Sequence, residues 1–194
     1  MKVHTATFLW GATDPANLPK HDLPEIAFAG RSNVGKSSLL NRLAGRHALA
    51  RVSKTPGRTQ QLNFFDLNGQ MVFVDLPGYG FARVPDAVRE QWKSLVEGYL
   101  SRRRHLRGVV VIVDVRRGVE DDDRQLIDYL FAQGTPVVVV ATKLDKLGRG
   151  ERQKRLRELA LQPLRGVGAL VGFSAESGDG IAELWREIDR LAVK

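Results

Sequence analysis

The 194-residue sequence predicts an α/β fold: a three-layer sandwich with a mostly parallel, six-stranded sheet and one antiparallel edge strand. Two observations carry this prediction. Short apolar, β-branched segments alternate with amphipathic helical patterns, as in parallel sheets that helices cover on both faces. Two further strands flank Asn68-Gly69, which tolerates positive φ and suits a hairpin turn between antiparallel neighbours. The length favours one domain over 1–194, with 1–24 as an N-terminal extension packed on it.

Each predicted element has its own signal. The helical pattern from Lys36 places three leucines on one face and stops at Gly45, and the pattern from Ile181 repeats apolar residues at helical spacing. The segments QQLNFFDL and QMVFVDL form the hairpin pair. The remaining strands are short apolar runs, of which the last is the weakest: 25–30, 108–115, 136–142 and 168–173.

Composition excludes several classes of protein. The formal net charge is +8, an excess that attracts polyanions. The chain has no cysteine, which excludes disulfides, thiolate metal sites and cysteine nucleophiles. The longest β-branched run, 109–113, is far shorter than the ~20 residues that cross a bilayer. We therefore expect a cytoplasmic protein without membrane contact.

The segment AGRSNVGKS, 29–37, fits the pattern G-x-x-x-x-G-K-[ST] between a strand and a helix. Its glycines let backbone N–H groups surround an anion at a helix N-terminus. We expect Lys36 to reach the β- and γ-phosphates of a nucleoside triphosphate, and the Ser37 hydroxyl to ligate Mg²⁺. The predicted phosphate-binding residues are Gly30, Arg31, Ser32, Asn33, Val34, Gly35, Lys36 and Ser37.

Two later motifs follow strands that end at the same edge of the predicted sheet. In DLPG, Asp75 is expected to hold a Mg²⁺-bound water and the Gly78 N–H to meet a γ-phosphate. In TKLD, the Asp145 carboxylate suits the two donors of guanine that adenine lacks, while Lys143 covers the ring. N–H groups in FSAES suit guanine O6. These motifs add Asp75, Leu76, Pro77, Gly78, Thr142, Lys143, Leu144, Asp145, Phe173, Ser174 and Ala175 to the predicted nucleotide site.

The order of these motifs is that of a G domain. The segments GRSNVGKSSLLN, TPGRTQ, DLPGYGFA and TKLDK together closely resemble the EngB family of bacterial ribosome-biogenesis GTPases, over nearly the whole chain. The resemblance implies hydrolysis of GTP to GDP and phosphate as a switch in assembly of the large ribosomal subunit, with a link to cell division and septation. It also implies a first switch formed by Gly57, Arg58, Thr59, Gln60 and Gln61, with Thr59 joining Ser37 and Asp75 as a Mg²⁺ ligand.

The residue after DLPG bears on catalysis. Many GTPases have a water-orienting glutamine there, and this chain has Tyr79, which does not easily take that role. Asn33 either ligates K⁺, as in the potassium-activated GTPases that this loop resembles, or caps local N–H groups. Arg31 and Arg58 are rival sources of positive charge. We expect slow intrinsic turnover, with potassium stimulation as a hypothesis, and assign catalysis to Lys36, Asn33 and Thr59.

Two basic clusters account for much of the positive charge: Arg102, Arg103, Arg104 and Arg107, and then Lys146, Arg149, Arg152, Lys154, Arg155 and Arg157. Either cluster alone is more often a solvated helix face. Together with the net charge they favour binding to an RNA backbone. The resemblance implies that the partner is ribosomal RNA in a large-subunit precursor and not DNA, and we expect a monomer. Two alternatives stay open: a P-loop kinase or ATPase, which would not need TKLD, and a nucleotide-occupied interaction protein with very slow turnover.

Overall fold

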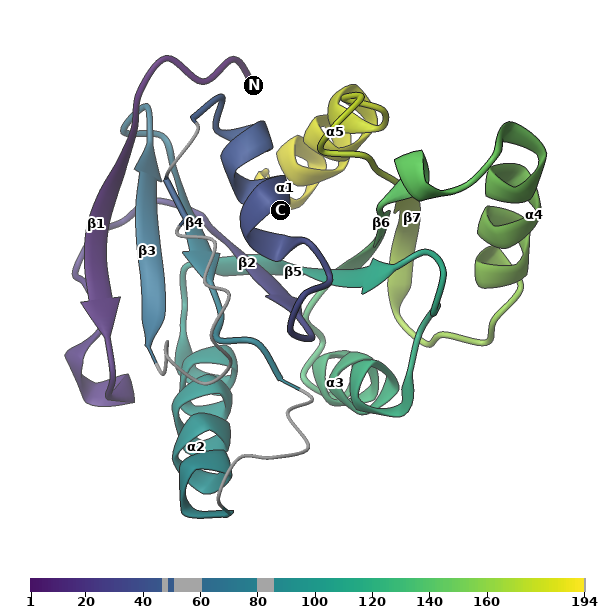
Figure 1. Ribbon diagram of the computed structural model, residues 1–194. Coiled ribbons are helices and arrows are strands. Elements are labelled where there is room, and N and C mark those ends of the chain that lie inside the picture. The colour runs from purple at the N-terminus through teal and green to yellow at the C-terminus, as the bar shows by residue number, and fades with distance from the viewer. Residues whose placement is uncertain (47–48, 51–60, 80–85, 194) are drawn as a thin grey trace.

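The computed structural model describes 1–194 except 47–48, 51–60, 80–85 and 194 (Figure 1). Its centre is a seven-stranded sheet in the order β1-β3-β4-β2-β5-β6-β7. The strands are β1 Ala6–Ala12, β2 Glu25–Gly30, β3 Leu62–Leu67, β4 Met71–Asp75, β5 Leu106–Asp114, β6 Val137–Thr142 and β7 Val167–Gly172. The helices are α1 Lys36–Leu43, α2 Asp86–Arg102, α3 Asp121–Ala132, α4 Arg149–Ala160 and α5 Ile181–Ala192, with short 3₁₀ turns at Pro15–Asn17 (η1) and Leu144–Lys146 (η2).

Helices cover both faces of the sheet, which confirms the predicted three-layer α/β fold (Figure 1). One apolar cluster joins the sheet to α2, α3 and α4. A second joins the other face to α1 and α5. Strands β2, β4 and β6 are buried along their whole length because helices lie on both sides of them.

The sheet has one strand more than the six that we expected. Residues of β1, expected to lie in an N-terminal extension, pair antiparallel with β3. The antiparallel strand β3 therefore lies second from the edge, between β1 and β4, and not at the edge itself. The outer backbone groups of β3 need hydrogen-bond partners, and β1 supplies them.

The hairpin between β3 and β4 forms as predicted. Asn68 and Gly69 have positive φ values of 59° and 64°. The N–H of Gln70 donates to the carbonyl oxygen of Leu67 at 3.0 Å, which closes a tight turn. Both central residues occupy the left-handed region that Asn-Gly tolerates and most other pairs do not.

A buried ion pair lies where β2 begins. Glu25 is 0% exposed, and its carboxylate accepts hydrogen bonds from Arg103 Nε at 2.8 Å and from the Tyr99 hydroxyl at 2.8 Å. The Arg103 guanidinium also donates to the carbonyl oxygen of Pro19. Arg103 thus serves the interior of the protein, which corrects its assignment to an RNA-binding cluster.

The described part of the chain has no helix that is long and apolar enough to span a bilayer.

Candidate nucleotide-binding site

The loop between β2 and α1 has the backbone shape that the phosphate-binding motif requires. Asn33 and Gly35 have positive φ values of 64° and 99°, and α1 begins directly afterwards at Lys36. A Cβ atom on Gly30 would lie 2.8 Å from the carbonyl oxygen of Ile112, so only glycine fits there. The free N–H groups of the first helical turn therefore open onto a narrow loop, as an anion site requires.

Lys36 and Asp75 meet at the carboxyl edge of the sheet. Lys36 Nζ forms an ion pair with Asp75 Oδ1, and each side chain is only 12% exposed. A triphosphate with Mg²⁺ would replace each partner of this ion pair by one of the same charge: negative phosphate oxygens beside Lys36 and the positive metal beside Asp75. The ion pair therefore places a cation and an anion where a triphosphate with its metal requires them.

The chemistry of the side chains at this edge fits Mg²⁺. The Ser37 hydroxyl and the Asp75 carboxylate are hard oxygen donors, and Mg²⁺ at phosphate sites takes one or two protein ligands besides phosphate oxygens and waters. Within the described ranges no three His, Cys, Asp or Glu side chains form a metal-binding group. Thr59 lies outside the described residues, as do Gly57, Arg58 and Gln60.

The DLPG segment runs beside the phosphate loop. Tyr79 N–H donates to the carbonyl oxygen of Gly30 at 3.4 Å, and Ser32 N–H donates to the carbonyl oxygen of Tyr79 at 3.2 Å. A Cβ on Gly78 would lie 3.1 Å from Ser32 Oγ, so the two segments pack closely. Ser32 Oγ is buried and has no hydrogen-bond partner among the described residues. A buried hydroxyl in that state indicates a ligand or water, and it suits a phosphate oxygen.

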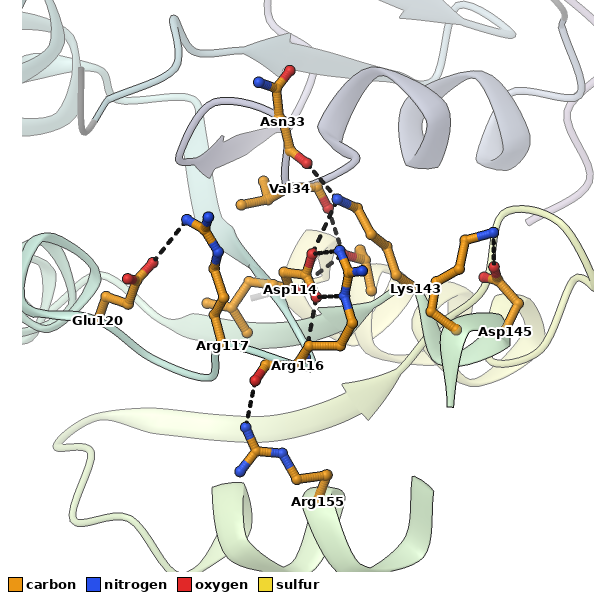
Figure 2. A network of polar contacts seen from close by, with 12 residues as sticks. Asn33, Val34, Asp114, Arg116, Arg117, Glu120, Lys143, Asp145 and Arg155 are labelled. Atoms are coloured by element: carbon orange, nitrogen blue, oxygen red, sulfur yellow. Dashed lines mark hydrogen bonds and ion pairs between the residues drawn. The ribbon is translucent and has the colours of Figure 1, made fainter. Parts of the chain in front are cut away.

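The TKLD segment, which is expected to bind the base, contacts the backbone of the phosphate loop. The Thr142 hydroxyl lies 2.5 Å from the carbonyl oxygen of Val34 and 3.0 Å from that of Val113. Lys143 has a φ of 63°, and its Nζ donates to the carbonyl oxygen of Asn33 at 2.6 Å (Figure 2). The end of β6 and the residue after it therefore support the loop that precedes α1.

Asp114, which sequence reasoning did not assign to the site, is the centre of this network (Figure 2). Its carboxylate pairs with Lys143 Nζ at 3.0 Å and takes two side-chain hydrogen bonds from Arg116, at 2.9 and 2.6 Å. Burial alone would raise the pKa of Asp114, but the hydrogen bonds from Arg116 and Lys143 hold it well below its usual value. Asp114 is thus a fixed negative charge that orients Lys143. The sequence signal that could have assigned Asp114 to the site is its place as an acidic residue at the end of an apolar strand.

Asp145 and Ser174 lie together although they are distant in sequence. Ser174 Oγ donates to Asp145 Oδ1 at 2.7 Å, and this bond is the main reason why the pKa of Asp145 is lowered. Lys146 Nζ lies 3.1 Å from the other carboxylate oxygen. The Leu144 N–H donates to the carbonyl oxygen of Phe173 at 3.2 Å, which joins the two segments through the backbone. The predicted base-binding carboxylate is ionised and held in one orientation.

Other predicted residues lie as follows. Arg31 pairs with Glu120 at the start of α3. The Asn33 side chain is exposed, and within the described ranges no hydrogen bond caps a local N–H with it. Gln61 Nε2 donates to Asn63 Oδ1 at 2.8 Å, beside Gly11 of β1.

A surface hollow of about 440 Å³ lies beside the hairpin turn, and no predicted site residue lines it. Its lining is Met1, Lys2, His4, Thr5, Asn68 and Gln70.

Comparison with known proteins agrees with this geometry. The family model for 50S ribosome-binding GTPases matches 25–143, and the model for the Elongation factor Tu GTP-binding domain matches 98–194. A probable GTP-binding protein EngB of Pelobacter propionicus is 49% identical over 193 residues, which cover 100% of this chain and 96% of that protein. A protein of the same name from an Exiguobacterium species is 46% identical, over 98% of both chains.

Two solved structures show the same fold. The crystal structure of a probable GTP-binding protein engB has a TM-score of 0.68 at 29% identity, over 87% of this chain and 98% of that one. Era in complex with MgGDPNP and nucleotides 1506–1542 of 16S ribosomal RNA has a TM-score of 0.69 at 24% identity, over 87% of this chain and 56% of that one. Fold, site and matches define a GTP-binding protein of the P-loop GTPase class. Within that class, the chain belongs to the EngB family.

Proposed function

We propose that this GTPase hydrolyses GTP slowly, with release of phosphate, and acts as a switch in assembly of the large ribosomal subunit. The observation that carries the nucleotide part is the alignment of DLPG with the phosphate loop, where the Ser32 N–H donates to the carbonyl oxygen of Tyr79 and the Tyr79 N–H donates to that of Gly30. The family model that matches the chain describes GTPases that bind the 50S ribosome, which supports the ribosomal part. The link to septation stays a prediction that no described residue explains.

The chain's own groups have separate roles in this mechanism. The loop backbone and Lys36 bind and orient the phosphates, and the Gly78 N–H is placed for the γ-phosphate. Mg²⁺, when bound through Ser37 and Asp75, neutralises charge on the β- and γ-phosphates. Asp145, held by Ser174, selects guanine. None of these groups is a strong general base, so positioning and electrostatics account for the rate, which is why we expect it to be low.

Asn33 is the residue on which potassium stimulation depends. We expect GTP turnover to be faster in KCl than in matched NaCl, because the exposed Asn33 side chain is free to join phosphate oxygens around a monovalent cation. Asn33→Ala should remove the difference between the two salts and leave the rate in NaCl unchanged. Steady-state phosphate release measures both. Equal wild-type rates in KCl and NaCl would exclude the cation and leave hydrolysis itself untouched.

The structure separates the basic residues into paired and exposed ones. Arg152 pairs with Asp179, and Arg155 with Glu158. Three exposed cations of α4 have no ion pair with any described residue: Arg149, Lys154 and Arg157. This helix lies at the β7 end of the sheet (Figure 1). We propose that this exposed α4 face contacts the phosphate backbone of ribosomal RNA.

Sedimentation with large-subunit precursor particles tests both the switch and its surface. We expect co-sedimentation with a GTP analogue and little with GDP. Replacing Arg149, Lys154 and Arg157 together with glutamine should weaken binding and lower the slope of log K against log salt by about 2–3. The matched control replaces three exposed lysines elsewhere: Lys2, Lys20 and Lys93. Equal loss in the control would exclude α4 as the contact surface, and equal binding with GDP would exclude the switch.

A further inference from the structure

The Tyr79 side chain is buried and contacts the start of α3. It is 8% exposed, and its hydroxyl donates to Asp123 Oδ1 in the first turn of α3 at 2.7 Å. Burial, followed by the negative charge of Asp123, raises the pKa of Tyr79 well above its usual value. The phenol therefore stays protonated and acts as a donor. Its single O–H donor is not available to a water molecule while this bond is made.

Asp123 is itself held in place by a second bond. It is 1% exposed, and its Oδ2 accepts a hydrogen bond from the Glu120 N–H at 2.9 Å. This contact is half of a capping box that fixes the start of α3. Tyr79 is thus bonded to a carboxylate that the helix already orients. Such an anchor gives a more precise position than a contact with a free loop end would give.

The same turn of α3 also holds the phosphate loop. Arg31 forms an ion pair with Glu120 and lies 3.9 Å from Asp122. Arg31 and Tyr79 are paired in an isolated parallel bridge, so their backbones run side by side. The side chains of both residues therefore reach one helix end from two adjacent segments. The start of α3 fixes the phosphate loop and the DLPG segment relative to each other.

We propose that Tyr79 is a positioning residue that, through its bond to Asp123, fixes the neighbouring Gly78 so that the Gly78 N–H lies at the place of the γ-phosphate. The proposal rests on the proposed GTPase function. GDP has no γ-phosphate, and its phosphates are held by the loop backbone and Lys36. Losing the Tyr79 hydroxyl should therefore weaken the binding of GTP more than that of GDP, because the Gly78 N–H that it positions meets only the γ-phosphate.

The test is the affinity of Tyr79→Phe for a non-hydrolysable GTP analogue and for GDP, by calorimetry with Mg²⁺. We expect the analogue to bind about tenfold more weakly and GDP to bind within twofold of wild type, since a hydrogen bond to a charged group contributes at least this much. The kcat for GTP should fall while the KM for GTP rises. Tyr99→Phe is the matched control, because that hydroxyl also donates to a buried carboxylate, Glu25, at 2.8 Å.

The control separates positioning from general stability. Both variants should lose thermal stability, but Tyr99→Phe should keep the wild-type ratio of analogue affinity to GDP affinity. The double variant Tyr79→Phe/Asp123→Ala should show no greater selective loss than Asp123→Ala alone, because the two residues act through one bond. An unchanged ratio in Tyr79→Phe, or additive losses in the double variant, would overturn the proposal. A wild-type protein that showed no preference for guanine over adenine nucleotides would instead overturn the proposed function.

Discussion

Replacing Arg103 with methionine is expected to lower the free energy of unfolding by about 3–5 kcal/mol. The substitution leaves the Glu25 carboxylate, which is 0% exposed, without the cation that neutralises it. The Tyr99 hydroxyl would still donate to Glu25, and His21 Nε2 would still lie 3.0 Å from the carboxylate, but burial lowers the pKa of His21, and two neutral partners do not offset the cost of burying a charge. Urea denaturation measures the effect, and the lost stability should appear as a lower midpoint at an unchanged slope.

Arg104→Met is the control, because Arg104 is exposed and belongs to the same run of arginines. We expect its effect to stay within about 0.5 kcal/mol. The double variant Glu25→Met/Arg103→Met should recover much of the loss, since it removes the unpaired charge as well. If Arg103→Met and Arg104→Met were equally stable, the buried pair would not contribute to stability.

The sequence predicted the centre of the sheet better than its edge. Strands β5 and β6 carry short runs of β-branched apolar residues, which are typical of buried strands, so both could be located in the sequence. Strand β1 gave no such signal, because Phe8, Leu9 and Trp10 are all exposed. A register shift between Phe8 and Trp10 also breaks the alternation that marks a strand with one buried face.

The site shows the same limit of local patterns. Gly35 and Lys36 were predictable because one motif contains both the backbone conformation and the chemistry. The partner of Tyr79 was not, because Asp123 is one of several consecutive acidic residues and only the fold selects the one that turns inward. Arg103 is the corresponding case among consecutive arginines. A run of like charges thus predicts that one of its residues pairs with a buried group, but it does not predict which one.

Replacing Asp145 with asparagine is expected to weaken GDP binding by about 10²- to 10⁴-fold. A carboxylate has two oxygens that accept hydrogen bonds from the two guanine donors. The amide of asparagine has one such oxygen, and its NH₂ group would face a guanine donor with another donor. Each charge-assisted bond contributes about 1.5–3 kcal/mol, which sets this range. Calorimetry with GDP and ADP measures the change. Affinity for ADP should not fall, because adenine lacks the two donors that Asp145 is proposed to bind.

Ser174→Ala supplies the intermediate case. The hydroxyl that it removes donates to Asp145 Oδ1 and accepts the N–H groups of Glu176 and Ser177, each at 3.2 Å. The carboxylate would keep its charge and lose its fixed orientation, so GDP binding should weaken by about tenfold, less than in Asp145→Asn. An Asp145→Asn variant that still preferred GDP to ADP as strongly as wild type would show that another group reads the base. The ordered pair of Asp145 and Ser174 would then be a structural contact between η2 and the segment after β7.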